Sequence, residues 1–230
     1  MPGRALRDPA AREEWAGILF DLDGTLVDRD AAHAAWVADL VERRRAELAD
    51  PEATRAALLA ADEGGRRSRR DYFAWLAAEL PQLGLGPRPP RAYPRELAAR
   101  VEPRPEVTAL LERLAARLPL GLVSNGAPPV QRLKLERAGL TSFFPRPVFS
   151  GDLRQRKPHP RLFAAGLASL GGEIPPARVL FVGDDPERDI AGARAAGLRT
   201  CWVSGGRPWP AELEPPEQVV ADVIELSLEE

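Results

Sequence analysis

Residues 17–27 read GILFDLDGTLV, a short apolar run that stops at an aspartate, with a second aspartate two positions later. The run does not alternate polar with apolar residues, which is typical of a strand that is covered on both faces of a sheet. Four more runs of this kind follow, at residues 120–123, 147–149, 179–182 and 200–203. Together they predict five buried strands.

Helical patterns separate most of these runs. They cover residues 106–118, 129–139, 160–170 and 189–196, and a glycine follows the last apolar position in several of them. Strands that alternate with helices connect through right-handed crossovers and therefore pair in parallel. The sequence thus predicts an α/β protein with a doubly wound, Rossmann-like parallel sheet.

Residues 28–100 interrupt this alternation, because they hold helical patterns and no strand. The patterns lie at residues 31–49, 52–62 and 69–80, and a proline-rich segment at 87–94 is expected to return in extended form. We therefore expect an α-helical cap at residues 28–100, inserted after the first strand. Residues 1–27 and 101–230 would then form the α/β core.

The composition is that of an ordinary globular protein of 230 residues, with 44% hydrophobic residues, 29% charged residues and a net charge of -2. The even spread of charge indicates no nucleic-acid partner. The single cysteine, Cys201, excludes an intrachain disulfide and a thiolate metal cluster. Residues 1–15 lack the apolar core of a signal peptide, and no apolar run reaches a membrane-spanning length, so we expect a cytoplasmic location. The sequence gives no signal for the oligomeric state.

Two carboxylates, Asp21 and Asp23, follow the first predicted strand and precede a flexible glycine. One carboxylate can attack phosphorus as a nucleophile while its neighbour acts as an acid and then as a base. The alternative is an aspartate-rich turn of the kind found in calcium loops. Leu26 and Val27, which come next, do not continue the calcium pattern.

Polar residues also follow three later strands. Ser124 and Asn125 can hold phosphoryl oxygens by hydrogen bonds, and Lys157 can neutralise negative charge. Asp184 and Asp185 supply the hard oxygen ligands that Mg²⁺ prefers. Because the carboxyl ends of parallel strands meet at one edge of the sheet, we expect all of these residues to converge on one site.

In order and spacing, these segments resemble the four motifs of the haloacid dehalogenase superfamily. Residues 20–26 resemble the first motif, Ser124 the second, Lys157 the third, and residues 183–185 with Asp189 the fourth. The inserted helices resemble the cap of the subfamily in which the cap follows the first motif. The resemblance covers nearly the whole chain.

The resemblance implies a covalent mechanism, with Asp21 as the nucleophile and Asp23 as the general acid and base. Ser124 and Lys157 would hold the phosphoryl group, and Asn125 would assist them. The partner would be a small-molecule phosphate ester.

The resemblance also implies Mg²⁺ as the cofactor. The ion would be held by the Asp21 carboxylate, the backbone carbonyl of Asp23 and the Asp184 carboxylate. Whether Asp185 reaches the ion directly or through water is left open. Asp189 would support the acidic loop from behind.

Asp23 favours phosphoryl transfer, because the dehalogenases of the superfamily lack an acid at this position. Residues 28–100 contain no lysine, so the Schiff-base lysine of a phosphonate hydrolase is missing. The expected activity is therefore hydrolysis of a phosphomonoester. A sugar-phosphate mutase and a catalytically idle binding or regulatory homologue stay as alternatives. The cap residues that could read the leaving group form a pool of Trp36, Arg66, Arg67, Arg69, Arg70, Tyr72 and Trp75.

Overall fold

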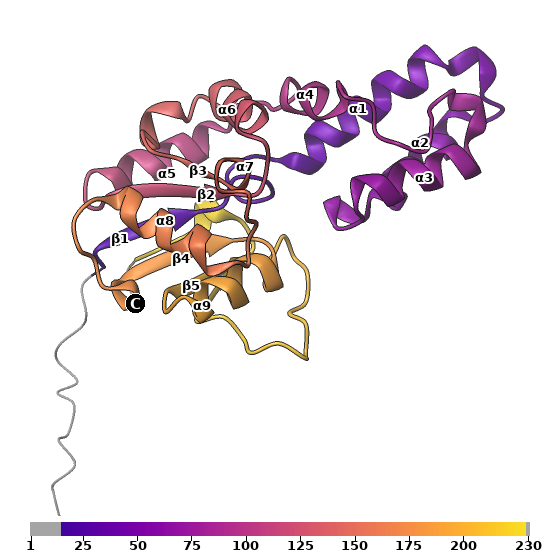
Figure 1. Ribbon diagram of the computed structural model, residues 1–230. Coiled ribbons are helices and arrows are strands. Elements are labelled where there is room, and N and C mark those ends of the chain that lie inside the picture. Colours follow the sequence, from indigo (N-terminus) through magenta and orange to yellow (C-terminus); the bar gives the residue numbers. More distant parts are fainter. Residues whose placement is uncertain (1–14, 229–230) are drawn as a thin grey trace, which may run out of the picture.

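The sheet of the computed structural model has six parallel strands in the order β3-β2-β1-β4-β5-β6 (Figure 1). The strands are β1 (Gly17–Phe20), β2 (Leu120–Ser124), β3 (Val148–Phe149), β4 (Val179–Gly183), β5 (Arg199–Val203) and β6 (Gln218–Val220). The structure describes residues 15–228. The order is that of a doubly wound sheet, as predicted, with β1 pairing with β2 on one side and β4 on the other.

Neighbouring side chains of each strand enter different hydrophobic clusters on the two faces of the sheet. Ile18 and Phe20 pack in the cluster that contains Leu110, while Leu19 packs in the cluster that contains Phe163. The helices of this part are α5 (Pro105–Ala115), α6 (Pro128–Arg137), α7 (Ser150–Leu153), α8 (Pro160–Leu170) and α9 (Gly192–Ala195). Both faces are thus covered, which explains why the strands read as unbroken apolar runs.

The predicted elements differ from the structure mainly at their ends. The helix at residues 160–170 is confirmed, but the segment predicted as a helix at 189–196 begins earlier, as a π-helical turn at Pro186–Ala191 (η6) that leads into α9. β6 was not predicted, because its middle residue is exposed and the strand does not form a buried apolar run. Short 3-10 turns lie at Arg45–Glu47, Glu63–Gly65, Pro81–Leu83, Thr141–Phe143, Pro176–Arg178 and Val223–Glu225.

The insertion between β1 and β2 is helical. It contains α1 (Arg29–Arg43), α2 (Pro51–Asp62), α3 (Arg69–Glu79) and α4 (Tyr93–Ala98), which form a lobe beside the sheet (Figure 1). The extended form expected for residues 87–94 is partly wrong, because α4 begins within this segment. Proline at the second position of a helix needs no hydrogen-bond partner for its nitrogen, so Pro94 fits there.

The helical lobe has a hydrophobic cluster of its own, separate from the two clusters of the sheet. Its centre is aromatic: the ring of Trp36 lies 4.8 Å from that of Tyr93, and the ring of Phe73 lies 4.9 Å from Tyr93. Trp36 and Tyr72, two members of the predicted recognition pool, are buried in this cluster. The limits of the predicted domains, at residues 28 and 100, stay a prediction.

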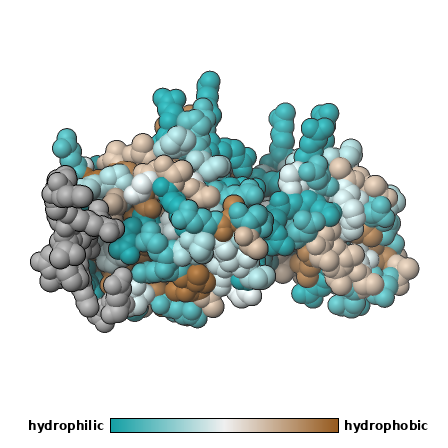
Figure 2. Space-filling model, turned by 90° about the horizontal axis from the view of Figure 1, so that it is seen from below, coloured by the Kyte–Doolittle hydropathy of each residue, from teal (hydrophilic) through white to brown (hydrophobic). Residues whose placement is uncertain are grey.

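The surface of the protein is mostly hydrophilic on the face seen in Figure 2, including the region where the helical lobe meets the sheet. None of the described helices combines the length and the apolar character that a membrane span requires. The expectation that the chain lacks a signal peptide concerns residues 1–15, and all of these except Trp15 lie outside the described residues.

Candidate active site

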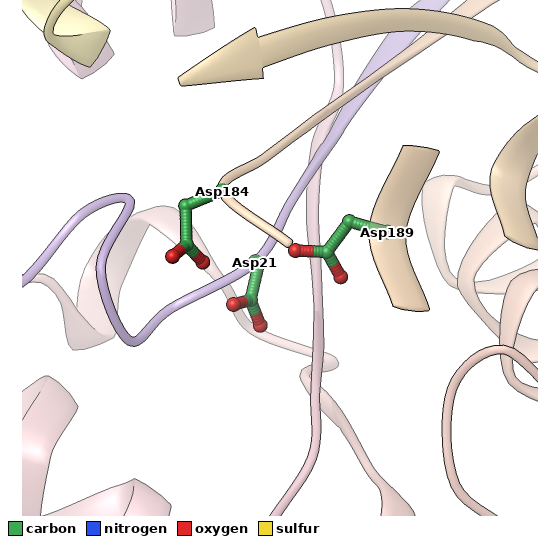
Figure 3. A group of neighbouring side chains, drawn as sticks. All are labelled: Asp21, Asp184 and Asp189. Atoms are coloured by element: carbon green, nitrogen blue, oxygen red, sulfur yellow. The ribbon is translucent and has the colours of Figure 1, made fainter. Parts of the chain in front are cut away.

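The site lies where the winding of the sheet reverses, at the carboxyl ends of β1 and β4. Asp21 follows β1 and Asp184 follows β4, and the Asp21 amide donates a hydrogen bond to the Val182 carbonyl at 2.9 Å. The carboxylates of Asp21 and Asp184 point into the same space (Figure 3). Each of Asp21, Asp184 and Asp189 offers an oxygen, and these oxygens lie within 4.8 Å of one another.

Gly24 allows the first acidic loop to approach the second. Its φ of +79° favours glycine, and a Cβ at this position would lie 2.7 Å from an Asp184 carboxylate oxygen. Both the backbone conformation and the lack of space for a Cβ atom therefore explain why glycine follows Asp23.

Lys157 connects two of the acids. Its Nζ lies 2.6 Å from Asp21 Oδ1 and 2.6 Å from Asp189 Oδ1, and the lysine side chain is 2% exposed. Burial alone would lower the pKa of Lys157, but the two carboxylates outweigh burial and hold the pKa above its usual value. The ammonium is therefore a fixed positive charge beside the predicted nucleophile.

Asn125 holds the backbone of Lys157. The Lys157 amide donates to Asn125 Oδ1 at 2.8 Å, and Asn125 Nδ2 donates to the Lys157 carbonyl at 3.2 Å. The segment after β2 and the segment before α8 are thus joined at the point where the lysine enters the site. In this structure, the side-chain amide of Asn125 bonds to that backbone.

Asp23 is held by two residues of α6 that the sequence analysis missed. Lys134 Nζ lies 2.6 and 2.7 Å from the two Asp23 oxygens, and Gln131 Nε2 donates to Asp23 Oδ2 at 3.0 Å. Gln131 Nε2 also donates to Ser124 Oγ at 2.7 Å. Burial would raise the pKa of Asp23, but Lys134 and then Gln131 outweigh it and lower the pKa below its usual value.

The sequence holds one signal for these two residues. Gln131 and Lys134 are three positions apart, so they share one face of the helix with the buried Leu135. A polar pair on the apolar face of a helix that follows a predicted site strand indicates a polar partner at the sheet edge. Arg137 and other charges on the same helix conceal this pattern.

Asp184 also has partners that were not predicted. Trp202 Nε1 and Arg207 Nη2 donate to its backbone carbonyl at 2.9 and 2.8 Å, and Arg207 Nη2 lies 3.4 Å from Asp184 Oδ2. Burial raises the pKa of Asp184 well above its usual value, and repulsion from Asp189 and Asp21 adds to the increase.

Asp185 and Asp189 differ in placement. Asp185 Oδ1 accepts from the amides of Glu187 and Arg188 at 3.1 and 2.7 Å, so this carboxylate caps η6 and is not one of the grouped acids. Direct contact between Asp185 and the ion was one of two possibilities that the sequence left open. In the structure, Asp189 rather than Asp185 is grouped with Asp21 and Asp184. Asp189 Oδ2 accepts from the Asp185 amide at 3.1 Å and supports the acidic loop from behind.

The donor set fits a hard divalent cation. Three buried or half-buried carboxylates face Lys157 and the one-third exposed Arg207, so negative charge exceeds the charge of the cations around it. Burial raises the pKa of Asp21 to about 7 although Lys157 opposes the change, and repulsion from Asp189 and Asp23 adds to it. An added cation would relieve this excess, and carboxylate oxygens are the ligands that Mg²⁺ prefers.

The doubly wound sheet and the acidic site at its switch point are those of an α/β protein whose candidate catalytic residues lie at the carboxyl ends of the strands. The sequence model of the haloacid dehalogenase-like hydrolases matches residues 15–197. The chain belongs to this family of hydrolases, as the resemblance implied.

Several similar proteins are phosphatases. The phosphoserine phosphatase of Thermus thermophilus is 41% identical over 128 residues, which are 55% of this chain and 50% of that protein. The ribulose-1,5-bisphosphate 5-phosphatase of Halopiger xanaduensis is 31% identical over 199 residues, which are 80% of this chain and 82% of that protein. The chain spans 50% to 60% of the length of three of the relatives it matches, the phosphoserine phosphatase among them.

Solved structures share the fold at low identity. The HAD-hydrolase YfnB of Bacillus subtilis superposes with a TM-score of 0.70 at 24% identity, over 92% of this chain and 96% of that chain. The L-2-haloacid dehalogenase of Xanthobacter autotrophicus gives a TM-score of 0.63 at 24% identity, over 91% and 95%. The likeness extends over the sheet and the inserted helices alike.

Proposed function

We propose that the protein is a magnesium-dependent phosphatase that cleaves a small phosphomonoester through an aspartyl-phosphate on Asp21. The observation that carries this proposal is the pair of contacts at the end of β1. Asp21 contacts the ammonium of Lys157, and Asp23, two positions later, is held by Lys134 and Gln131 of α6. The phosphatase names of the relatives support the same reaction class.

In the first step, an oxygen of Asp21 attacks phosphorus, and the bond from phosphorus to the ester oxygen breaks. Asp23 in its acid form gives its proton to that oxygen, so the alcohol leaves uncharged. Lys157 offsets the negative charge that gathers on the transferring group. The product of this step is the free alcohol and a phosphorylated Asp21.

In the second step, Asp23, now a carboxylate, takes a proton from a water molecule as the water oxygen attacks phosphorus. The acyl–phosphate bond breaks, Asp21 regains its carboxylate, and inorganic phosphate is released. The lowered pKa of Asp23 suits this base role, because Lys134 stabilises the ionised form.

Asp21 and Asp184, with the backbone carbonyl of Asp23, would hold the magnesium ion. When bound, the ion would supply the positive charge that allows an anionic nucleophile to meet an anionic phosphate. Ser124 and Lys157 would orient the phosphoryl oxygens. Ser124 is 1% exposed and accepts a hydrogen bond from Gln131, which leaves its own proton free for donation.

The acid at position 23 distinguishes phosphoryl transfer from halide displacement, because a halide leaves without a proton. The phosphatase relatives favour transfer to water over transfer within a sugar phosphate.

Hydrolysis of para-nitrophenyl phosphate tests the proposal. We expect turnover with Mg²⁺, its loss in EDTA, and a fall in kcat of at least about 1000-fold in Asp21→Asn, because the nucleophile is removed. Asp152→Asn, an exposed aspartate of α7, is the matched control and should keep wild-type activity. Equal activity of wild type and Asp21→Asn, or turnover that ignores EDTA, contradicts the proposal.

A further inference from the structure

A cleft of about 320 Å³ lies between the helical lobe and residues 126–131, which follow β2. The lobe contributes three arginines: Arg69 at the start of α3, Arg91 before α4, and Arg95 within α4. The opposite wall is the segment that leads from β2 into α6, and it includes Gln131.

The cleft and the candidate active site share one residue, Gln131. Gln131, which lines the cleft, donates hydrogen bonds to both Asp23 and Ser124. Asp23 is the residue that meets the leaving oxygen in the proposed reaction. The part of a substrate that lies beyond this oxygen would therefore extend toward the cleft.

The three guanidinium groups have no acidic partner. In the part of the chain that the structure describes, no carboxylate lies within ion-pairing distance of Arg69, Arg91 or Arg95. Glu96, the neighbour of Arg95, accepts from Trp36 Nε1 at 2.8 Å. Their charge is therefore available to a ligand.

The structure also narrows the pool of arginines taken from the sequence. Arg67 forms an ion pair with Glu63 at 2.8 Å and lies over the ring of Trp75, so its guanidinium group already has partners within the protein. Arg66 and Arg70 do not line the cleft. Of the four cap arginines in the pool, Arg69 alone faces it.

We propose that the substrate carries a second anionic group, a carboxylate or a further phosphate, which Arg69, Arg91 and Arg95 bind in this cleft. Guanidinium groups bind both kinds of oxyanion through paired hydrogen bonds. Pro94, Pro129 and Val130 also line the cleft and offer apolar surface to a short carbon skeleton between the two charges. The proposal rests on the proposed function, because it places the scissile phosphate at Asp21.

Matched substrates test the proposal. The anionic esters are carboxyalkyl phosphates and alkane bisphosphates of increasing chain length, and each is compared with the alkyl phosphate of the same length. We expect wild type to prefer an anionic ester, and each of Arg69→Met, Arg91→Met and Arg95→Met to reduce this preference about tenfold, through KM. The two anionic series distinguish a carboxylate from a second phosphate.

Two neighbouring arginines serve as controls. Arg70 and Arg88 are exposed and lie outside the cleft, so Arg70→Met and Arg88→Met should keep the wild-type preference. Loss of preference in these controls as well would mean a general charge effect and would overturn the proposal.

Binding to full-length Asp21→Asn separates this inference from the activity itself. Calorimetry with the same ester pairs should show tighter binding of the anionic member, and each of the additional changes Arg69→Met, Arg91→Met and Arg95→Met should reduce the difference about tenfold. Equal binding of both members would contradict the proposal that the cleft binds a second anionic group, even if para-nitrophenyl phosphate is hydrolysed. Absence of hydrolysis with binding that depends on the three arginines overturns the proposed function and leaves the cleft supported.

Discussion

Asp23 must be an acid in one half of the proposed reaction and a base in the other. The structure holds it in the base form, since Lys134 contacts both of its oxygens and lowers its pKa. Lys134 does not touch the predicted nucleophile, so it acts on the reaction through Asp23. We regard Lys134 as a positioning residue.

Replacing Lys134 should change the pH dependence of the reaction. Lys134→Met removes the nearest positive charge and raises the pKa of Asp23, so Asp23 keeps its proton to a higher pH. The alkaline limb of kcat/KM for an alkyl phosphate should therefore move to higher pH, while its maximum falls about 10- to 100-fold as positioning is lost. Lys134→Arg should restore part of the rate.

Para-nitrophenyl phosphate provides the comparison, because nitrophenolate leaves without a proton. Its alkaline limb should move less in Lys134→Met than that of the alkyl ester. An unchanged limb with both esters would show that Lys134 supports structure only.

At the residue scale, the sequence located the acids but not the groups that hold them. Asp21 and Asp184 follow strand ends and lie close together, and Asp189, which was expected only to support the acidic loop, is grouped with them. Lys134 and Arg207 lie far from these strands in the chain, and their contacts depend on how a helix and a loop fold back. The spacing of Gln131 and Lys134 indicates a polar partner, but no local pattern identifies which residue that partner is.

Among the helices, α1 and α2 are joined by an ion pair next to the lobe's first connection to the sheet. Arg29 makes two hydrogen bonds to the Asp62 carboxylate, one of them at 2.7 Å, and Asp62 is 4% exposed. Burial would raise the pKa of Asp62, but Arg29 outweighs it and holds the pKa below the usual 3.8.

This pair should give the lobe an acid-sensitive contribution to stability. Because the folded pKa of Asp62 lies below its unfolded value, the contribution is complete above pH 3.8 and is lost as the pH falls through the folded pKa. Asp62→Asn should lower the free energy of unfolding by about 3 kcal/mol at neutral pH, measured by urea titration. The difference from wild type should shrink in acid.

Glu63→Gln is the control for this measurement, because it breaks the exposed pair with Arg67. Its effect should stay below about 1 kcal/mol. A loss as large as that of Asp62→Asn would mean that burial of the ion pair has no special importance.

The elements with the clearest local sequence pattern were the ones that the sequence predicted best. β1, β4 and α8 follow from buried apolar runs and from a proline at a helix start. β6 has an exposed middle residue, and α4 begins among prolines, so neither has a distinct pattern. Their formation depends on packing against the rest of the chain.

The whole molecule has hydrophobic clusters that do not merge. The aromatic cluster of the lobe holds the inserted helices together, and the two clusters of the sheet hold the remainder. Parts with separate cores can open separately.

Two phenylalanines test this division. Phe73 is buried in the lobe and Phe163 is buried against the sheet. Each change to alanine should cost about 3–5 kcal/mol in its own part. In hydrogen exchange, Phe73→Ala should expose the amides of α1 to α4 and leave the strands protected, whereas Phe163→Ala should do the reverse. If both variants reduced hydrogen-exchange protection equally throughout the chain, the result would contradict two separately stable cores.

The insertion leaves after β1 and returns before β2, and these two strands are direct neighbours, with Ile18 opposite Leu120. Exchange of residues 28–100 for another run of helices would thus leave every strand pairing in place. During evolution, this segment can be exchanged or can diverge without any change in the residues that we propose to cleave the phosphate ester. Selection for a new ester would then act on one third of the gene, while the chemistry is inherited unchanged.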